Sequence, residues 1–189
     1  MVNIIKSVEE LNGLDIGVAG VIPFSFQEGE LYFLFGREAK DNKKEDRALW
    51  GDFGGTIRKE KEKNFEGLVR EFWEETNGLF GTVEGIRSYI NENFSKLLIV
   101  HCEKYNGVIV FLPMEYEKKY ERMFHTQNIL YKHVLDTKKE IQRARSRGLL
   151  EKDLIQWYTM AEIMKQKKKF RKCNHDIIDF MNETFNPSL

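Results

Sequence analysis

Three glutamates and an arginine fall within one short stretch of the sequence, Arg70-Glu71-Phe72-Trp73-Glu74-Glu75. On a helix, the i, i+3 and i+4 spacing of the glutamates places them on one face, with neighbouring Cβ atoms about 5–6 Å apart. Carboxylates held so close repel one another, and a hard divalent cation with oxygen ligands offsets the repulsion. Arg70 can pair with one of them and fix its orientation. The spacing predicts metal-assisted chemistry; a solvated acidic helix face is the alternative.

A glycine pair, Gly54-Gly55, and a further acid, Glu62, precede this stretch. Glycine allows the backbone to approach a ligand closely. The carbonyls of such a turn can add a metal ligand, and its amides can face phosphate oxygens. Together with Arg70, these residues favour a metal site over a solvated face.

This arrangement resembles the box of the Nudix family. The family pattern is a glycine, five residues, a glutamate, seven residues, Arg-Glu, an apolar residue, any residue, Glu-Glu, any residue, a glycine and an apolar residue. The segment from Glu62 to Glu75 matches it without a gap. Two one-residue insertions depart from it, because six residues separate Gly55 from Glu62 and two residues separate Glu75 from Gly78.

The resemblance implies an α/β fold, a Nudix-like α/β/α sandwich with a mixed β-sheet and added helices. It also implies a hydrolase acting on phosphoanhydride bonds, a pyrophosphatase that cleaves the diphosphate linkage of a nucleoside diphosphate-linked small molecule. Mg²⁺ or Mn²⁺ would be the cofactor. The implied catalytic residues are Glu71, Arg70 and Glu74, and the implied metal ligands are Glu71, Glu74, Glu75, Glu62 and Gly54.

Substrate contacts and the general base are less closely defined. Arg37 and Arg58 carry the bidentate chemistry that suits phosphate, and Gly55 belongs to the glycine turn, so these three are the candidate substrate-binding residues. Solvent exposure is the alternative for both arginines. Glu71 is the first candidate for the base that activates water. Glu151, just before a predicted strand, is the second, with an ordinary surface position as its alternative.

Two basic clusters keep an RNA-directed activity, such as messenger RNA decapping, among the hypotheses. The run from Lys165 to Lys172 carries six positive charges in eight residues, and Arg143, Arg145 and Arg147 form the second cluster. Such clusters can bind a nucleic-acid backbone or form solvated helix faces. The altered loop spacings motivate a third hypothesis, a catalytically inactive Nudix-fold binding module.

Composition restricts the class of protein. The 189 residues, 41% of them hydrophobic, are expected to form a single Nudix hydrolase domain over 1–189. Charge is balanced at 30 Lys+Arg and 30 Asp+Glu, so net charge gives no argument for nucleic acid or membrane. Two cysteines indicate no disulfide scaffold. With no signal peptide and no apolar run of about 20 residues, a cytoplasmic protein is expected, without a membrane partner. The oligomeric state is open, and a homodimer is compatible with the sequence.

Hydrophobic periodicity and turn residues predict the remaining elements. A helix over 64–76 has the apolar stripe Phe65, Leu68 and Phe72, an N-cap at Asn64 and a stop at Asn77-Gly78. Residues 40–47 read as a charged loop. We predict strands at 15–25, 31–35, 96–102, 107–112 and 154–158, a short helix at 82–93, a helical insertion at about 115–150, and a helical tail at about 160–186 that is broken near Cys173.

Overall fold

The computed structural model describes residues 2–39, 48–135, 137–145 and 147–185. The predicted loop at 40–47 lies outside them. Within the described residues, the strands are β1 (Val2–Ile4), β2 (Val18–Gln27), β3 (Glu30–Glu38), β4 (Trp50–Gly51), β5 (Phe53–Thr56), β6 (Leu98–Cys102), β7 (Gly107–Pro113) and β8 (Lys152–Thr159). The α-helices are α1 (Val8–Gly13), α2 (Asn64–Glu75), α3 (Val83–Asn93), α4 (Lys119–Val134), α5 (Lys138–Arg145), α6 (Met160–Lys165) and α7 (His175–Phe185).

The strands form one mixed sheet in the order β1-β6-β7-β2-β3-β4, with β5 on β2 and β8 on β3. The β2–β7 pair is parallel, and the other pairs are antiparallel. The long strand β2 changes partner along its length. Val18–Val21 pairs with β5, whereas Phe24–Gln27 pairs with β3. The sheet therefore divides beside β5, and this division opens the space in which the candidate site lies.

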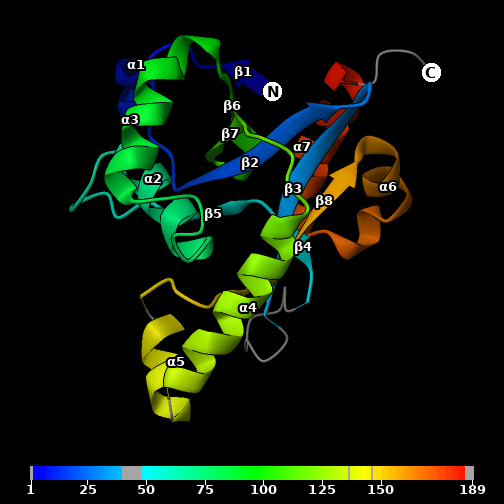
Figure 1. The fold of residues 1–189 in the computed structure, drawn as a ribbon. Coiled ribbons are helices and arrows are strands. Elements are labelled where there is room, and N and C mark those ends of the chain that lie inside the picture. The colour runs from blue at the N-terminus through cyan, green and yellow to red at the C-terminus, as the bar shows by residue number, and fades with distance from the viewer. Residues whose placement is uncertain (1, 40–47, 136, 146, 186–189) are drawn as a thin grey trace.

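Helices cover both faces of the sheet, and Figure 1 shows α1, α2 and α3 on one side of β2 and β3, with α6 and α7 on the other. Each face has its own buried apolar cluster. The first contains Leu11, Leu68 and Ile90 from α1, α2 and α3, and the second contains Ile163 and Ile178 from α6 and α7. The prediction of an α/β sandwich with a mixed sheet and added helices is confirmed.

Helix α2 is anchored by its apolar stripe. Phe65, Leu68 and Phe72 are buried, as predicted. The expected cap, Asn64, is instead the first residue of the helix, and the N-cap lies one residue earlier. Lys63 is the N-cap, and its backbone N–H donates to the Glu66 carboxylate. The Asn64 side chain instead donates to the carbonyls of Leu11 and Leu14, at 2.8 Å each.

The end of α2 follows the sequence prediction. Asn77 and Gly78 both adopt the left-handed conformation, with φ values of 52° and 70°. These contacts at both ends and along the stripe fix the direction in which α2 presents its acidic face.

The predicted helical insertion and tail are each divided. The insertion consists of α4 and α5, and Figure 1 shows α4 extending from the sheet towards α5. The tail breaks into α6, two 3₁₀ turns at Lys167–Lys169 and Lys172–Asn174, and α7, so the predicted break near Cys173 is confirmed. Within the described part of the chain, no helix combines the length and the apolar character needed to cross a bilayer.

Candidate active site

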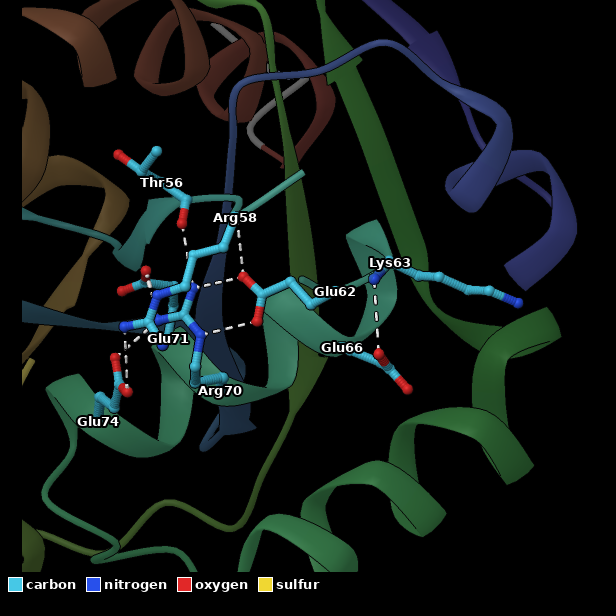
Figure 2. Close-up of polar contacts among 8 residues, drawn as sticks. All are labelled: Thr56, Arg58, Glu62, Lys63, Glu66, Arg70, Glu71 and Glu74. Carbon is cyan, nitrogen blue, oxygen red and sulfur yellow. Dashed lines mark hydrogen bonds and ion pairs between the residues drawn. The ribbon is translucent and has the colours of Figure 1, made fainter. Parts of the chain in front are cut away.

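Arg70 stands at the centre of the acidic cluster, and Figure 2 shows the carboxylates of Glu62, Glu71 and Glu74 around its guanidinium. Its Nε and Nη2 donate to the two carboxylate oxygens of Glu62 at 2.9 and 2.7 Å. Its Nη1 donates to Glu71 Oε1 and Glu74 Oε2, at 2.7 Å each. A fifth bond, of 3.0 Å, runs from Nη2 to the Thr56 carbonyl. One guanidinium therefore orients three carboxylates and ties them to the end of β5.

The glycine pair of β5 brings the backbone against the helix. The Gly54 N–H donates to Glu75 Oε2 at 2.7 Å. A Cβ at Gly55 would lie 2.5 Å from Glu71 Oε2, closer than two such atoms can approach. Only glycine lets the Glu71 carboxylate lie this close to the strand.

A cavity of about 490 Å³ opens beside this contact. The glycine pair and Thr56 form part of its wall. The charged residues that line it are Glu38, Arg58, Glu71, Glu75, Glu151 and Arg171. Since four carboxylates face two arginines here, the cavity suits a cation together with the anion that the cation neutralises.

A buried charge network, made of Glu38, Asp52, Glu75 and Lys152, lies behind the cavity. Lys152 is fully buried, and its Nζ is 2.6 Å from Glu38 Oε1 and 3.3 Å from Glu75 Oε1. Asp52 accepts a hydrogen bond of 2.7 Å from the Asn174 amide. The ion pairs compensate carboxylates that would otherwise be costly to bury.

Burial governs the protonation of the two carboxylates nearest the glycine pair. It raises the pKa of Glu71, while Arg70 opposes this effect and the charges of Glu74 and Glu151 add to it. Burial also raises the pKa of Glu75, with Lys152 opposing and Glu38 and Asp52 adding. Both side chains therefore hold a proton more readily than an exposed glutamate does, and a nearby cation would favour their ionised forms.

The structure brings most of the sequence-predicted site residues together. Glu71, Glu75, Gly54, Gly55, Arg58 and Glu151 all line the cavity. Glu62 and Glu74 are not among its lining residues, but both pair with Arg70, which also holds Glu71. Arg37 lies elsewhere, since it forms a bidentate pair with Asp153 at 2.8 and 3.1 Å and sits over the Trp50 ring. Its guanidinium is therefore committed to β8 and β4.

Sequence reasoning missed Glu38, Lys152 and Arg171. Arg171 was counted within the basic run, and nothing in that run separates it from its exposed neighbours. Glu38 and Lys152 lie at the ends of β3 and β8, beside the charged residues Arg37 and Asp153, so the sequence carried no clear signal of a buried pair.

The described residues do not form a ready-made metal site with three protein ligands. Within residues 2–39, 48–135, 137–145 and 147–185, no three His, Cys, Asp or Glu side chains form a group that could hold an ion. Arg58, Arg70, Lys152 and Arg171 supply the positive charge among the carboxylates. A cation bound by Glu71 and Glu74 would exchange their contacts with Arg70 for contacts with the ion.

Comparison with known proteins gives few relatives. No family model matches the chain. The uncharacterized protein L534 of Acanthamoeba polyphaga mimivirus is 46% identical over 66 residues, which cover 35% of this chain. The match spans 21% of that protein's length.

Solved structures similar to this chain include Nudix proteins. The M. smegmatis Nudix hydrolase RenU has a TM-score of 0.47 and 12% identity, with coverage of 98% of this chain and 96% of RenU. A mutT/nudix family protein from Listeria innocua has a TM-score of 0.46 and 12% identity, covering 92% and 94%. The NUDIX domain of Shewanella oneidensis NrtR, complexed with ADP ribose, has a TM-score of 0.46 and 11% identity, covering 89% and 86%. Because these three TM-scores are below 0.5, the case for a function depends on the geometry of the site itself.

Proposed function

We propose that this chain is a Mg²⁺-dependent hydrolase of the Nudix type, which cleaves the diphosphate linkage of a nucleotide-derived substrate. The observation that carries the proposal is the Arg70 cluster beside the glycine pair. One arginine orients Glu62, Glu71 and Glu74 through bonds of 2.7 to 2.9 Å, and Glu71 faces the cavity. Precise placement of a few polar groups is what phosphoryl chemistry asks of a protein.

The donor chemistry of the site fits a hard divalent cation. Glu71 and Glu75 offer carboxylate oxygens at the cavity wall, Gly54 lines the same wall, and Glu74 shares Arg70 with Glu71. Mg²⁺ and Mn²⁺ prefer oxygen ligands of this kind. When bound, the ion would neutralise phosphate oxygens and activate a water molecule. Close packing of Glu71 against Gly55 limits the motion of the carboxylate.

Glu71 is our choice for the general base. Burial raises its pKa, and a base with a pKa nearer to neutrality transfers protons more effectively. Glu71 would take the proton of the attacking water, while Arg70 holds the Oε1 atom and stabilises the orientation. Arg58, at the same cavity, would contact phosphate oxygens. Glu151 lines the cavity as well and is the alternative base.

A hydrolysis screen tests this proposal. Purified protein with Mg²⁺ or Mn²⁺ is offered nucleotide sugars, dinucleoside polyphosphates, nucleoside triphosphates, diphosphoinositol phosphates and capped RNA. We expect turnover of at least one phosphoanhydride, lost on chelation. Glu71→Gln should lower it by at least about 10²-fold, and Glu66→Gln, on the exposed face of the same helix, should not.

Failure can take two forms. Activity retained in Glu71→Gln would remove the assignment of the base. No turnover of any of these substrates with either metal would overturn the hydrolase, and a protein that then binds a nucleotide diphosphate would be a binding module.

A second candidate, an RNA-directed hydrolase, draws support from the surface beside α6. Lys165, Lys168 and Lys169 are exposed and line a broad groove. Lysines spaced along a groove suit a phosphate backbone. Filter binding of a short capped RNA at rising salt tests this candidate. Absence of binding at low salt would end it.

A further inference from the structure

An arginine from the C-terminal part of the chain lines the candidate cavity. Arg171 lies 100 residues beyond Glu71 in the sequence, yet both line the same cavity. Among the described residues of its wall, Arg58 and Arg171 carry the positive charges. Arg58 comes from the loop before α2, and Arg171 comes from the segment between α6 and α7.

The fold holds this segment against the strands through several contacts. The Arg171 N–H donates to the Trp50 carbonyl at 2.8 Å, and Phe170, which is buried, forms a parallel bridge with Trp50. The Asn174 amide donates to the buried Asp52 carboxylate at 2.7 Å. Contacts made by the residues just before and just after Arg171 therefore fix its place in the fold.

Gly51 leaves room for the aliphatic part of this arginine. A Cβ at Gly51 would lie 2.7 Å from Arg171 Cδ, so a larger residue would displace the side chain. Strand β4 and the segment between α6 and α7 therefore pack closely around the Arg171 side chain, which lines the cavity.

Arg171 contacts the charge network and also lines the cavity. Lys152 is the nearer partner of Glu38, at 2.6 Å, whereas Arg171 Nη1 lies 3.5 Å from the same oxygen. A planar guanidinium binds a phosphoryl group through two parallel hydrogen bonds.

We propose that Arg171 is a substrate-binding residue that contacts a phosphoryl group of the diphosphate. This inference builds on the proposed function. A diphosphate carries two anionic groups, and the cavity offers two arginines, so the arginines can share the phosphoryl groups between them.

Binding of methylenediphosphonate, which resists hydrolysis, tests the inference without activity. Titration calorimetry in Mg²⁺ buffer compares wild type with Arg171→Gln, Arg171→Lys and Lys172→Gln, the last an exposed neighbour. We expect Arg171→Gln to raise Kd by about 10-fold or more. Arg171→Lys should recover part of the loss, and Lys172→Gln should leave Kd unchanged.

Kinetics and stability separate binding from a merely structural role. With a substrate from the screen, Arg171→Gln should raise KM more than it lowers kcat, at a melting temperature close to that of the wild type. A Kd within twofold of the wild type in folded Arg171→Gln overturns the inference. Should that variant not fold, Arg171→Lys decides, because loss of the planar fork predicts at least about threefold weaker binding and an unchanged Kd contradicts it.

The two proposals fail in different ways. Hydrolysis that depends on Glu71, together with an unchanged Kd in Arg171→Gln, would overturn only the proposed role of Arg171. Diphosphonate binding that depends on Arg171, without hydrolysis of any substrate, would overturn only the proposal that the chain is a hydrolase.

Discussion

Arg70 and Glu62 are joined by two parallel hydrogen bonds of 2.9 and 2.7 Å, while the remaining terminal nitrogen of Arg70 donates to Glu71 and Glu74. Arginine alone offers this combination, because its donors are fixed in one plane. The pair holds the loop before α2 against the helix and orients the acidic face at the same time.

Replacing Arg70 by lysine is therefore expected to impair the site more than the fold. Arg70→Lys keeps the charge but loses the fork, so the carboxylates lose their common orientation. We expect activity to fall about 10- to 100-fold, the range seen when groups that orient metal ligands are removed. Steady-state assays at saturating metal measure the loss. Arg87→Lys, an exposed arginine on α3, is the matched control, and equal activity in the two variants would contradict the role of Arg70.

Glu71→Gln is expected to remove activity while preserving or raising stability at neutral pH. Burial raises the pKa of Glu71 in the folded protein, so the folded state binds its proton more tightly than the unfolded state does. The contribution of Glu71 is then favourable at pH values below its unfolded pKa and is lost as pH rises through the folded pKa. At pH 7 the ionised group costs stability, and glutamine avoids that cost.

Melting temperatures from pH 4 to 8 check this prediction. The difference between Glu71→Gln and wild type should grow in favour of the variant as pH rises. A variant that is less stable than wild type at pH 8, yet equal at pH 4, would show that ionised Glu71 stabilises the fold.

Alanine at the two neighbouring glycines is expected to have opposite effects on folding and activity. At Gly55 the new Cβ meets the end of the Glu71 side chain, which can move away. Gly55→Ala should therefore lower activity at least about 10-fold with a small change in melting temperature. At Gly54 the new Cβ meets the Gly20 backbone, which cannot move cheaply. Gly54→Ala should cost about 1–3 kcal/mol of stability.

Activity assays and urea unfolding of both variants measure these effects. Gly13, which has open space around its Cα, provides the control substitution Gly13→Ala. Full activity in Gly55→Ala would mean that the contact between Gly55 and Glu71 is not needed for turnover.

Lys152→Met is expected to be among the most destabilising single changes. It leaves Glu38 and Glu75 buried without the ammonium that lies 2.6 and 3.3 Å from them. Breaking one side of a buried ion pair costs about 3–5 kcal/mol. Urea unfolding at pH 7 measures the loss, with the exposed Lys96→Met as control. Adding Glu38→Gln to Lys152→Met should recover part of the stability, and no recovery would mean that packing, not charge, sets the cost.

Local patterns predicted the elements that present the acidic face. The α2 helix follows its apolar stripe and ends at a residue pair that tolerates the left-handed conformation, both visible in the sequence. The i, i+3 and i+4 spacing placed the three glutamates together, with Glu71 and Glu75 against the glycine pair of β5 and Glu74 beside Gly148. The structure adds that one guanidinium holds Glu62 as well.

The rest of the cavity depends on contacts between distant segments. Glu38 and Lys152 meet because β3 pairs with β8. The sequence of either strand alone does not determine the register of that pairing. Arg171 reaches the cavity because Phe170 lies beside Trp50. The short strands β1, β4 and β5 have too few residues for periodicity to identify them. The sequence alone therefore does not show that Glu38 and Lys152 are buried or that Arg171 lines the cavity.

The anchoring of Phe170 beside Trp50 adds a segment from the C-terminal part of the chain to the cavity wall, which otherwise comes from β2, β3, β5, the loop before α2, α2 and the residue before β8. Substitutions in α2 alter Glu71 and Glu75, whereas substitutions between α6 and α7 alter the wall at Arg171 and Cys173. Variation between α6 and α7 can therefore change which ligands the cavity accepts while the acidic helix stays constant. Engineering of this chain should begin at residues 170–174 when a new ligand is sought.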